Sequence, residues 1–189
     1  AVIGAGTMGR GIAQAFAQCD EVEKVYLCDI KQEFADGGKA KVKASLDKRV
    51  AKGKMEQAVA DAIVNKIQTG LNDQAVDPDL VVDLKKECFK NLQENIVKNE
   101  NCIYASNTSS LSITEIGAGL KKPVIGMHFF NPAPVMKLVE VIAGINTPKE
   151  TVEAVKEIAV KLGKTPVQVE EAPGFVVNRI LIPEINEGI

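Results

Sequence analysis

Short apolar runs alternate with amphipathic segments along most of the chain. The opening run Ala1–Ile3 is followed by a helical apolar face within residues 11–18, and a second apolar run over 25–28 ends at Asp29. Short runs bounded by turn residues are typical of buried strands, whereas apolar spacings of three and four are typical of helices. The pattern therefore predicts a βαβ unit at the start of the chain.

The alternation continues after one interruption. Residues 32 to about 68 are charged and rich in Lys and Ala, with a break at Gly53, which predicts an inserted helical hairpin. Further strands are predicted over 79–82, 102–105, 124–127, 137–142 and 166–169, and helices over 84–98, 112–119 and 148–162. Strands that alternate with helices predict an α/β fold with a Rossmann-type, doubly wound and mostly parallel sheet.

Composition and charge narrow the class of protein. The 189 residues are 46% hydrophobic, which is enough for a sizeable core, and their formal net charge is −2. This charge does not favour binding to nucleic acid. No apolar run has the length needed to cross a bilayer. We therefore expect a cytoplasmic protein without nucleic-acid or membrane partners.

The cysteines are widely separated, with no Cys-x-x-Cys pair and no neighbouring histidine. They are Cys19, Cys28, Cys88 and Cys102. Zinc sites and small disulfide scaffolds are recognised by close, repeated cysteine spacing. The sequence therefore predicts neither a metal site nor a disulfide framework.

A glycine-rich motif joins the first predicted strand to the first predicted helix. It has the form Gly-x-Gly-x-x-Gly over Gly4, Gly6 and Gly9, with Thr7 and Met8 inside it. Such glycines allow a tight turn, a close approach to a pyrophosphate and close packing of the helix on the strand. The free amides at the helix start attract phosphate. The motif indicates a dinucleotide site, although glycines also cluster in ordinary turns.

An acidic residue at the end of the second predicted strand supports the dinucleotide interpretation. Asp29 follows Gly9 by 20 residues, the spacing at which a carboxylate accepts from the ribose 2′-hydroxyl. The same carboxylate would repel the 2′-phosphate of NADP, so we expect NAD as the cofactor. The neighbouring Lys31 keeps NADP as an alternative.

The chain has a single histidine, His128, where a predicted strand runs into Asn131 and Pro132. Histidine titrates near neutral pH without assistance, so one placed at a strand end is a candidate proton carrier. A lone histidine in an apolar run can equally be a packing residue. This segment by itself does not decide between the two interpretations.

Three further motifs follow one another along the chain. They are Ser-Asn-Thr-Ser-Ser (106–110), His-Phe-Phe-Asn-Pro (128–132) and Pro-Gly-Phe-Val-Val-Asn-Arg (173–179). Together with the glycine motif and the hairpin they resemble the 3-hydroxyacyl-CoA dehydrogenases, particularly the bacterial 3-hydroxybutyryl-CoA dehydrogenases. The resemblance covers essentially the whole chain. It implies an NAD-dependent enzyme that interconverts 3-hydroxyacyl-CoA and 3-oxoacyl-CoA in fatty-acid or butyrate metabolism.

The resemblance also implies roles for individual residues. His128 matches the catalytic base, and Glu140 matches the carboxylate that pairs with it. Ser109 and Asn178 match residues that hydrogen-bond the reacting oxygen and the neighbouring substrate, and Ser109 also matches a cofactor contact. Asn131 matches a contact to substrate or nicotinamide. Without the resemblance, Ser109 and Asn178 would be interpreted as helix caps.

Positions outside the catalytic motifs match ligand contacts too. Ser45 and Lys52 match residues that touch coenzyme A, and Lys85 matches a cofactor contact. Ser45 and Lys52 are seven residues apart, so they share a helix face on which Lys52 could meet a phosphate. The alternative for the many lysines here is a solvated helix face.

Two segments are shorter than the family pattern. After 79–82 the family carries a short Glu-Ala-Ala-x-Glu segment, whose second glutamate borders the cofactor, whereas this chain continues directly into Asp83. A smaller shortening lies near 121–123. The first of these removes the glutamate that borders the cofactor in the family pattern, through either a deletion or a loop missing from the sequence.

We expect the following domain organisation. Residues 1–174 form the NAD-binding Rossmann-like domain, with the hairpin at about 32–68, and 175–189 begin a helix leading to an all-helical C-terminal domain. That domain lies outside the chain, and the resemblance implies that it forms a homodimer. A few residues are also expected before Ala1. The alternative function is a non-catalytic dinucleotide-binding protein of the same fold.

Overall fold

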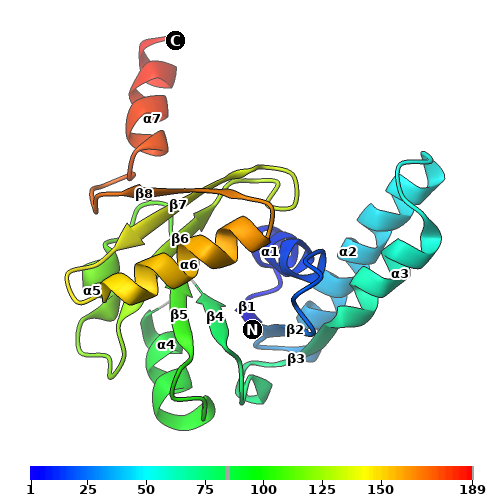
Figure 1. Ribbon diagram of the computed structural model, residues 1–189, viewed down its shortest axis with the longest axis horizontal. Helices are drawn as coiled ribbons and strands as arrows, with labels where there is room; N and C mark the ends of the chain where they lie inside the picture. Colours follow the sequence, from blue (N-terminus) through cyan, green and yellow to red (C-terminus); the bar gives the residue numbers. More distant parts are fainter. Residues whose placement is uncertain (84–85, 189) are drawn as a thin grey trace.

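The computed structural model of the protein, which describes residues 1–83 and 86–188, contains one large sheet (Figure 1). Its strands are β1 (Val2–Ile3), β2 (Val25–Asp29), β3 (Ile67–Leu71), β4 (Leu80–Asp83), β5 (Ile103–Ser106), β6 (Val124–Phe129), β7 (Leu138–Ala143) and β8 (Thr165–Val169). The order across the sheet is β3-β2-β1-β4-β5-β6-β7-β8. All pairs are parallel except β6 with β7. The predicted Rossmann-type sheet is confirmed.

The connecting segments are mostly helical. They include α1 (Thr7–Ala17), α2 (Gln32–Ala51), α3 (Gln57–Lys66), α4 (Lys86–Asn91), α5 (Ile113–Gly117), α6 (Lys149–Lys161) and α7 (Val177–Glu187). A short 3₁₀ turn covers Asn72–Gln74, and α4 continues into a π-helical stretch over Leu92–Ile96. Within the two described ranges, none of the helices combines the length and the apolar character needed to cross a membrane.

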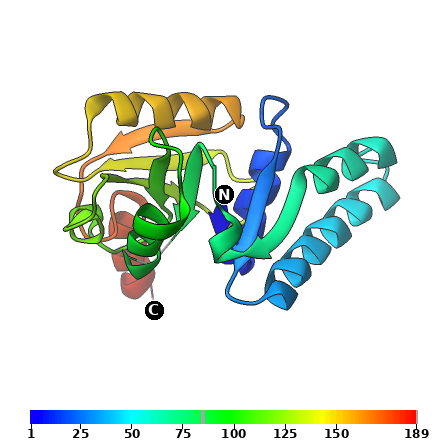
Figure 2. The ribbon, with the colours of Figure 1, turned by 90° about the horizontal axis from the view of Figure 1, so that it is seen from below.

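Successive residues of the central strands pack on opposite faces of the sheet. On β1, Val2 belongs to the core that includes side chains of α1 and α6, whereas Ile3 belongs to the core with α4 and α5. On β2, Leu27 and Cys28 divide in the same way. This two-residue period is the property of an extended strand covered on both faces, and Figure 2 shows α4 and α6 on either side of the sheet.

The inserted hairpin consists of α2 and α3, and it projects from the β3 edge of the sheet (Figure 1). Strand β3, which follows it, was not predicted. It pairs in parallel with β2 over Val25–Asp29. Only Ile67 and Gly70 of its five residues are buried, so the strand lacks the continuous apolar run that identifies its neighbours. Pairing with β2, rather than its own pattern, defines it.

Helix α7 begins where the sequence predicts a helix, and it stands away from the sheet (Figure 1). None of its described residues is buried, and Ile180, Leu181, Ile182 and Ile185 are exposed. An exposed apolar surface of this kind is commonly a contact for another part of the protein or a partner.

Candidate active site

The glycine motif forms the turn from β1 to α1 and is anchored to the end of β2. Gly4 has a φ of +92°, which favours glycine, and its amide donates to the carbonyl of Cys28 at 2.7 Å. The Asp29 carboxylate accepts from the amides of Ala5 and Ile30, each at 2.7 Å. The structure thus brings Asp29 to the glycine turn, as the sequence predicts.

Gly9 and Gly6 of the motif differ in the space available for a side chain. A Cβ on Gly9 would lie 1.7 Å from the carbonyl oxygen of Gly4, so the close packing of α1 on β1 excludes any side chain there. A Cβ on Gly6 would meet nothing within 4 Å. Gly6 is the N-cap of α1, and Thr7 and Met8 are the first residues of the helix. These residues fit a pyrophosphate, because a helix start offers unpaired N–H groups to an anion.

The remaining predicted cofactor residues are Lys85 and, as a possible NADP determinant, Lys31. Lys85 lies outside the described residues. Lys31 is exposed, with its Nζ 3.7 Å from Glu33 and 5.3 Å from the centre of the Phe34 ring. Both partners lie at the start of α2. The contacts that the structure describes for Lys31 are therefore with α2 and not with the Asp29 carboxylate.

His128 and Glu140 face each other across the β6–β7 pair. The antiparallel register places them opposite one another, and His128 Nδ1 lies 2.7 Å from Glu140 Oε2. Their side chains are 7% and 1% exposed. The other oxygen of Glu140 accepts from the amides of Val176 and Val177, at 3.1 and 3.0 Å. A carboxylate so held fixes the ring orientation and leaves Nε2 for proton exchange.

Aromatic rings line the His128 imidazole. The Phe130 ring centre lies 4.6 Å away and that of Phe175 lies 5.7 Å away, both tilted. Phe175 is buried and has a φ of 51°, an uncommon backbone conformation for a bulky residue. Such outliers gather at functional sites, where the surrounding structure holds them. Phe130 and Phe175 were not predicted as site residues, although both lie within motifs that the sequence displays.

Ser109 and Asn178 are brought together from distant parts of the chain. The Asn178 side-chain amide donates to the carbonyl of Ser109 at 3.5 Å. The cap of α5 is Ser112, whose side chain accepts from the amide of Glu115. Asn178 lies within the first turn of α7, after the N-cap residue Val176. The structure therefore gives neither Ser109 nor Asn178 the capping role that the alternative interpretation assigned.

Two residues, Asn107 and Thr108, position the Ser109 loop, and neither was predicted as a site residue. The Asn107 side chain accepts from the amide of Phe129 at 2.8 Å, which ties the end of β5 to the end of β6. Thr108 Oγ1 accepts from the amides of Ser110 and Leu111. The order Ser-Asn-Thr-Ser-Ser carries the residue types that favour such side chain-to-backbone bonds, which is the signal that could have identified them.

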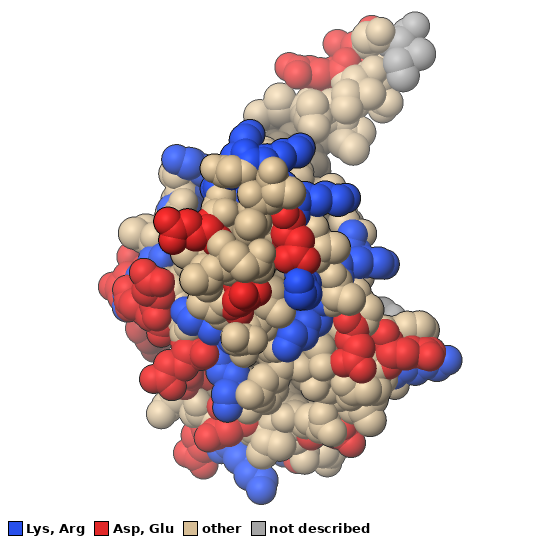
Figure 3. Space-filling view, turned by 90° about the vertical axis from the view of Figure 1, so that its right-hand side faces the viewer, with Lys and Arg blue, Asp and Glu red and all other residues tan. Residues whose placement is uncertain are grey.

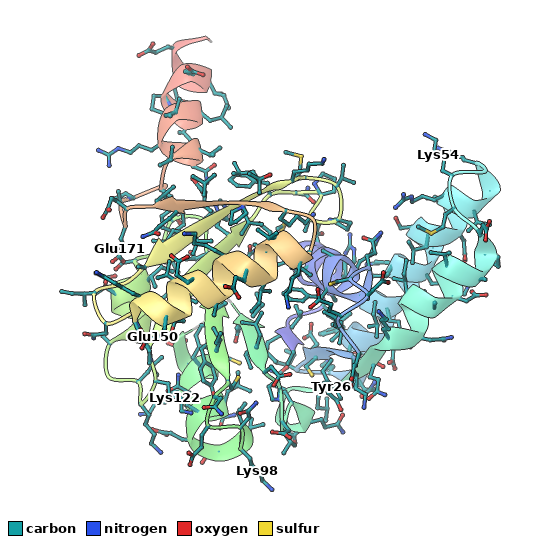
Figure 4. All side chains as sticks on the ribbon, viewed as in Figure 1. Tyr26, Lys54, Lys98, Lys122, Glu150 and Glu171 are labelled. Carbon is teal, nitrogen blue, oxygen red and sulfur yellow. The ribbon has the colours of Figure 1, made fainter. Side chains whose placement is uncertain are left out.

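Glu171 ties the loop before α7 to the start of α5. Its carboxylate accepts from the hydroxyls of Ser112 and Thr114 and from the amide of Thr114. Burial raises the pKa of Glu171, but these hydrogen bonds outweigh it and hold the pKa below its usual value. In Figure 4, Glu171 lies at the end of β8, close to α5. This contact holds the Asn178 side of the site against the Ser109 side.

A pocket of about 230 Å³ lies between α1, α2 and the β6–β7 turn. Thr7, Arg10, Lys41, Ser45 and Asn131 contribute polar groups to its lining. Ser45 and Asn131, which are both predicted substrate residues, thus line the same pocket. Lys52, at the end of α2, is exposed and does not line it.

Two cations, Arg10 and Lys41, line this pocket, and its lining includes no Asp or Glu. They were not predicted as site residues, because Arg10 is an isolated basic residue on α1 and Lys41 is one of several lysines on α2. Over the hairpin side of the molecule as a whole, positive and negative side chains are mixed (Figure 3). Most lysines on that side thus belong to a solvated surface, whereas Arg10 and Lys41 border a cavity suited to an anionic ligand.

Comparison with known proteins agrees with this geometry. Residues 1–172 match the family model of the 3-hydroxyacyl-CoA dehydrogenase NAD binding domain. A 3-hydroxybutyryl-CoA dehydrogenase of Clostridioides difficile is 47% identical over an alignment that covers 100% of this chain and 69% of the relative. A probable 3-hydroxybutyryl-CoA dehydrogenase of Deinococcus radiodurans is 48% identical, with the same coverage.

A solved structure and the length of the alignment add to these matches. The (S)-3-hydroxybutyryl-CoA dehydrogenase of Ralstonia eutropha superposes with a TM-score of 0.87 at 43% identity, covering 98% of this chain and 68% of that one. The C. difficile alignment spans 199 positions, more than the 189 residues of this chain, so that relative has residues that are absent here. The chain belongs to the 3-hydroxyacyl-CoA dehydrogenase family, and its residues 1–172 correspond to that family's NAD-binding domain.

Proposed function

We propose that this protein catalyses reversible hydride transfer between NAD and a 3-hydroxyacyl-CoA, with His128 as the general base and acid. The observation that carries the proposal is the buried pair of His128 and Glu140, with Nδ1 and Oε2 2.7 Å apart. A positioned histidine exchanges a proton most effectively near neutral pH. The names of the relatives favour 3-hydroxybutyryl-CoA as the substrate.

The proposed reaction balances with the groups at hand. In oxidation, His128 Nε2 takes the proton of the C3 hydroxyl while the C3–H electron pair departs as hydride, which leaves a carbonyl at C3. NAD, when bound, accepts the hydride at its nicotinamide. In reduction His128 returns the proton to the forming alkoxide oxygen. Glu140 stabilises the imidazolium in both directions, because its carboxylate accepts from Nδ1–H.

The neighbouring polar residues are proposed to orient the substrate. Ser109 and Asn178 lie on two segments held together by the Asn178–Ser109 contact, and we assign them to hydrogen bonds with the reacting oxygen and the thioester region. Asn131 follows the β6 end and lines the pocket next to α1, which suits a contact to substrate or nicotinamide. Holding both reactants in one geometry supplies a large share of the rate of such a reaction.

The coenzyme A portion is assigned to the pocket between α1, α2 and the β6–β7 turn. Its phosphates would contact Arg10 and Lys41, and its other polar groups would contact Ser45. Lys52 would lie beyond the pocket, at the end of α2. The pocket connects Asn131 with the hairpin, so an extended thioester could run from the reacting carbon toward α2.

Compartment and assembly extend the same proposal. Cys19, Cys28 and Cys102 are buried thiols outside any disulfide, which suits a reducing cytoplasm. The exposed apolar residues of α7 suit a following domain through which a homodimer would form. We propose a cytoplasmic homodimer on these grounds.

An NADH oxidation assay with acetoacetyl-CoA, run on the full-length protein and on His128→Ala, tests the function. The wild type should turn over, and His128→Ala should lose about 10²- to 10⁴-fold in kcat, the range that a positioned base contributes. NADH fluorescence titration should give the same dissociation constant for both. Equal turnover of the two proteins would remove His128 from the mechanism. NADH binding without any wild-type turnover would support the alternative, a non-catalytic dinucleotide-binding protein.

A further inference from the structure

Lys164 is a buried cation that the proposed mechanism does not use. It follows Gly163, which ends α6 with a φ of +70°, and it precedes β8. Although it is a lysine, its residue is only 8% exposed. Lysine is among the residue types least often buried without a partner, because an ammonium loses its hydration there. The hydrogen bonds of its ammonium therefore indicate why it is buried.

The Lys164 ammonium donates to two backbone carbonyls of the β6–β7 turn. Its Nζ lies 2.6 Å from the carbonyl oxygen of Ala133 and 2.9 Å from that of Met136. Both acceptors are neutral, and burial lowers the pKa of the Lys164 ammonium. The next residue adds a third connection, since the amide of Thr165 donates to the carbonyl of Lys137 at 2.7 Å.

The turn that Lys164 holds forms one wall of the coenzyme A pocket. Asn131, Pro132, Ala133 and Pro134 line that pocket, whereas Lys164 does not. On the pocket side the turn approaches α1, where a Cβ added to Gly11 would lie 3.4 Å from Pro134 Cδ. Lys164 thus contacts the turn without itself lining the pocket.

The internal hydrogen bonds of the turn are few. The amides of Val135 and Met136 both donate to the carbonyl of Pro132. Among the described hydrogen bonds, Lys164 is the side-chain donor to the carbonyls of Ala133 and Met136. The bond to Ala133 is buried and the bond to Met136 is partly buried, and backbone carbonyls shielded from water need such partners. We propose that Lys164 is a positioning residue that fixes the β6–β7 turn, and with it Asn131 and the pocket wall, for binding of the acyl-CoA.

This proposal rests on the proposed function, and steady-state kinetics with acetoacetyl-CoA and NADH on the full-length protein test it. Lys164→Met keeps an unbranched side chain of similar length and removes the ammonium that donates both hydrogen bonds. The KM for acetoacetyl-CoA should rise about tenfold, because a small displacement of a binding wall is costly. The kcat should stay within about twofold, because no described hydrogen bond joins the turn to His128 or Glu140, and the KM for NADH should rise less than the KM for acetoacetyl-CoA, because Gly4, Gly9 and Asp29 lie outside the turn.

Two further variants separate positioning from general stability. Lys164→Arg keeps the charge and the donors and should recover most of the wild-type KM for acetoacetyl-CoA. Lys66→Met is the matched control, because Lys66 Nζ also donates to a backbone carbonyl, that of Cys19, at 2.8 Å. Lys66 lies at the end of α3, away from the turn, so its KM values should not change. An unchanged KM for acetoacetyl-CoA in folded Lys164→Met, or an equal rise in Lys66→Met, would overturn the proposal.

Hydrogen exchange of the 130–137 segment gives a second readout that does not need turnover. The amides of Val135 and Met136 should exchange faster in Lys164→Gln than in the wild type, while segments of β2 and α1 keep their rates. Lys164→Gln also replaces Lys164→Met in the kinetics if the latter does not fold. Absence of wild-type turnover would defeat the proposed function, whereas unchanged exchange in the turn would defeat the role of Lys164.

Discussion

The carboxylates of Asp29 and Glu140 both lie on strands and both accept hydrogen bonds from backbone amides. They differ in exposure and in the groups that they contact. Asp29 ends β2, is partly exposed, and accepts from the nearby amides of Ala5 and Ile30. An ionised carboxylate has about four acceptor sites. Asp29 therefore holds the glycine turn in place and retains acceptor capacity for a ligand hydroxyl.

Glu140 uses both of its carboxylate oxygens within the protein. One oxygen faces His128 Nδ1 and the other accepts from the amides of Val176 and Val177. At 1% exposure it is also closed to solvent. It can reach a substrate only through the histidine and through the start of α7. We therefore propose that the carboxylate at the nucleotide end of the sheet binds a ligand, whereas Glu140 organises protein groups.

The largest effect should come from Glu140, and two substitutions separate its two tasks. Glu140→Gln can still accept from Val176 and Val177, but its NH₂ group would face His128 Nδ1 and favour the tautomer with the proton on Nε2. The kcat should fall at least about a hundredfold, as expected when a base is held in the wrong tautomer. Stability should remain close to that of the wild type. Acetoacetyl-CoA reduction and chemical unfolding measure the two effects.

Glu140→Ala is the companion variant. It removes the acceptor of two amides as well as the histidine partner, so it should lose a similar factor in kcat and also about 1–3 kcal/mol in the free energy of unfolding. NADH affinity should be unchanged in both variants, because Glu140 contacts no part of the glycine motif. Wild-type kcat in Glu140→Gln would show that the pair does not set the tautomer of His128.

An intermediate effect is expected from the glycine motif, where two identical substitutions should behave differently. Gly9→Ala would place a Cβ 1.7 Å from the Gly4 carbonyl oxygen, so it should lose about 1–3 kcal/mol or more of stability through overpacking and bind NADH weakly. Gly6→Ala would place its Cβ in open space, and the φ of Gly6, −66°, is accessible to alanine. It should retain stability and lose only NADH affinity. Normal NADH affinity in Gly6→Ala would exclude a pyrophosphate at that position.

The nucleotide end could be predicted from the sequence because its contacts are local. Gly4, Gly9 and Asp29 lie within one βαβ unit. The backbone conformation at Gly4 and the close packing at Gly9 favour glycine, and the Asp29 carboxylate accepts from the nearby amide of Ala5. The alternation of Val2 with Ile3 between two cores follows from a two-residue period. The sheet class and most strands were therefore predictable from the pattern alone.

The reaction end was predictable only in part, because its contacts join residues far apart in the chain. The resemblance supplied the pairing of His128 with Glu140, but nothing in the sequence pattern indicates that Glu140 also accepts from Val176. Lys164 was missed for the same reason, since its two acceptors are backbone carbonyls that any residue type could provide. Strand β3 was missed because its pairing with β2 comes from tertiary structure.

The smallest expected effect concerns Asp29 and tests whether its remaining acceptor capacity faces the ribose. Asp29→Asn removes the charge and leaves one oxygen, so only one of the amides of Ala5 and Ile30 keeps its acceptor. The ratio of kcat/KM for NADH to that for NADPH should fall about tenfold, which corresponds to about 1.4 kcal/mol of discrimination. The reason is that the carboxylate no longer repels a 2′-phosphate and no longer accepts from a 2′-hydroxyl as strongly.

Asp36→Asn is the control for the change in net charge. Asp36 lies on α2, and its carboxylate accepts from Gln32 and Thr69 without contacting the glycine turn. This variant should keep the wild-type preference between the two cofactors. If Asp29→Asn kept that preference as well, Asp29 would be a purely structural anchor of the Ala5 turn. The contrast with Glu140 would then disappear, because both carboxylates would act only on the protein around them.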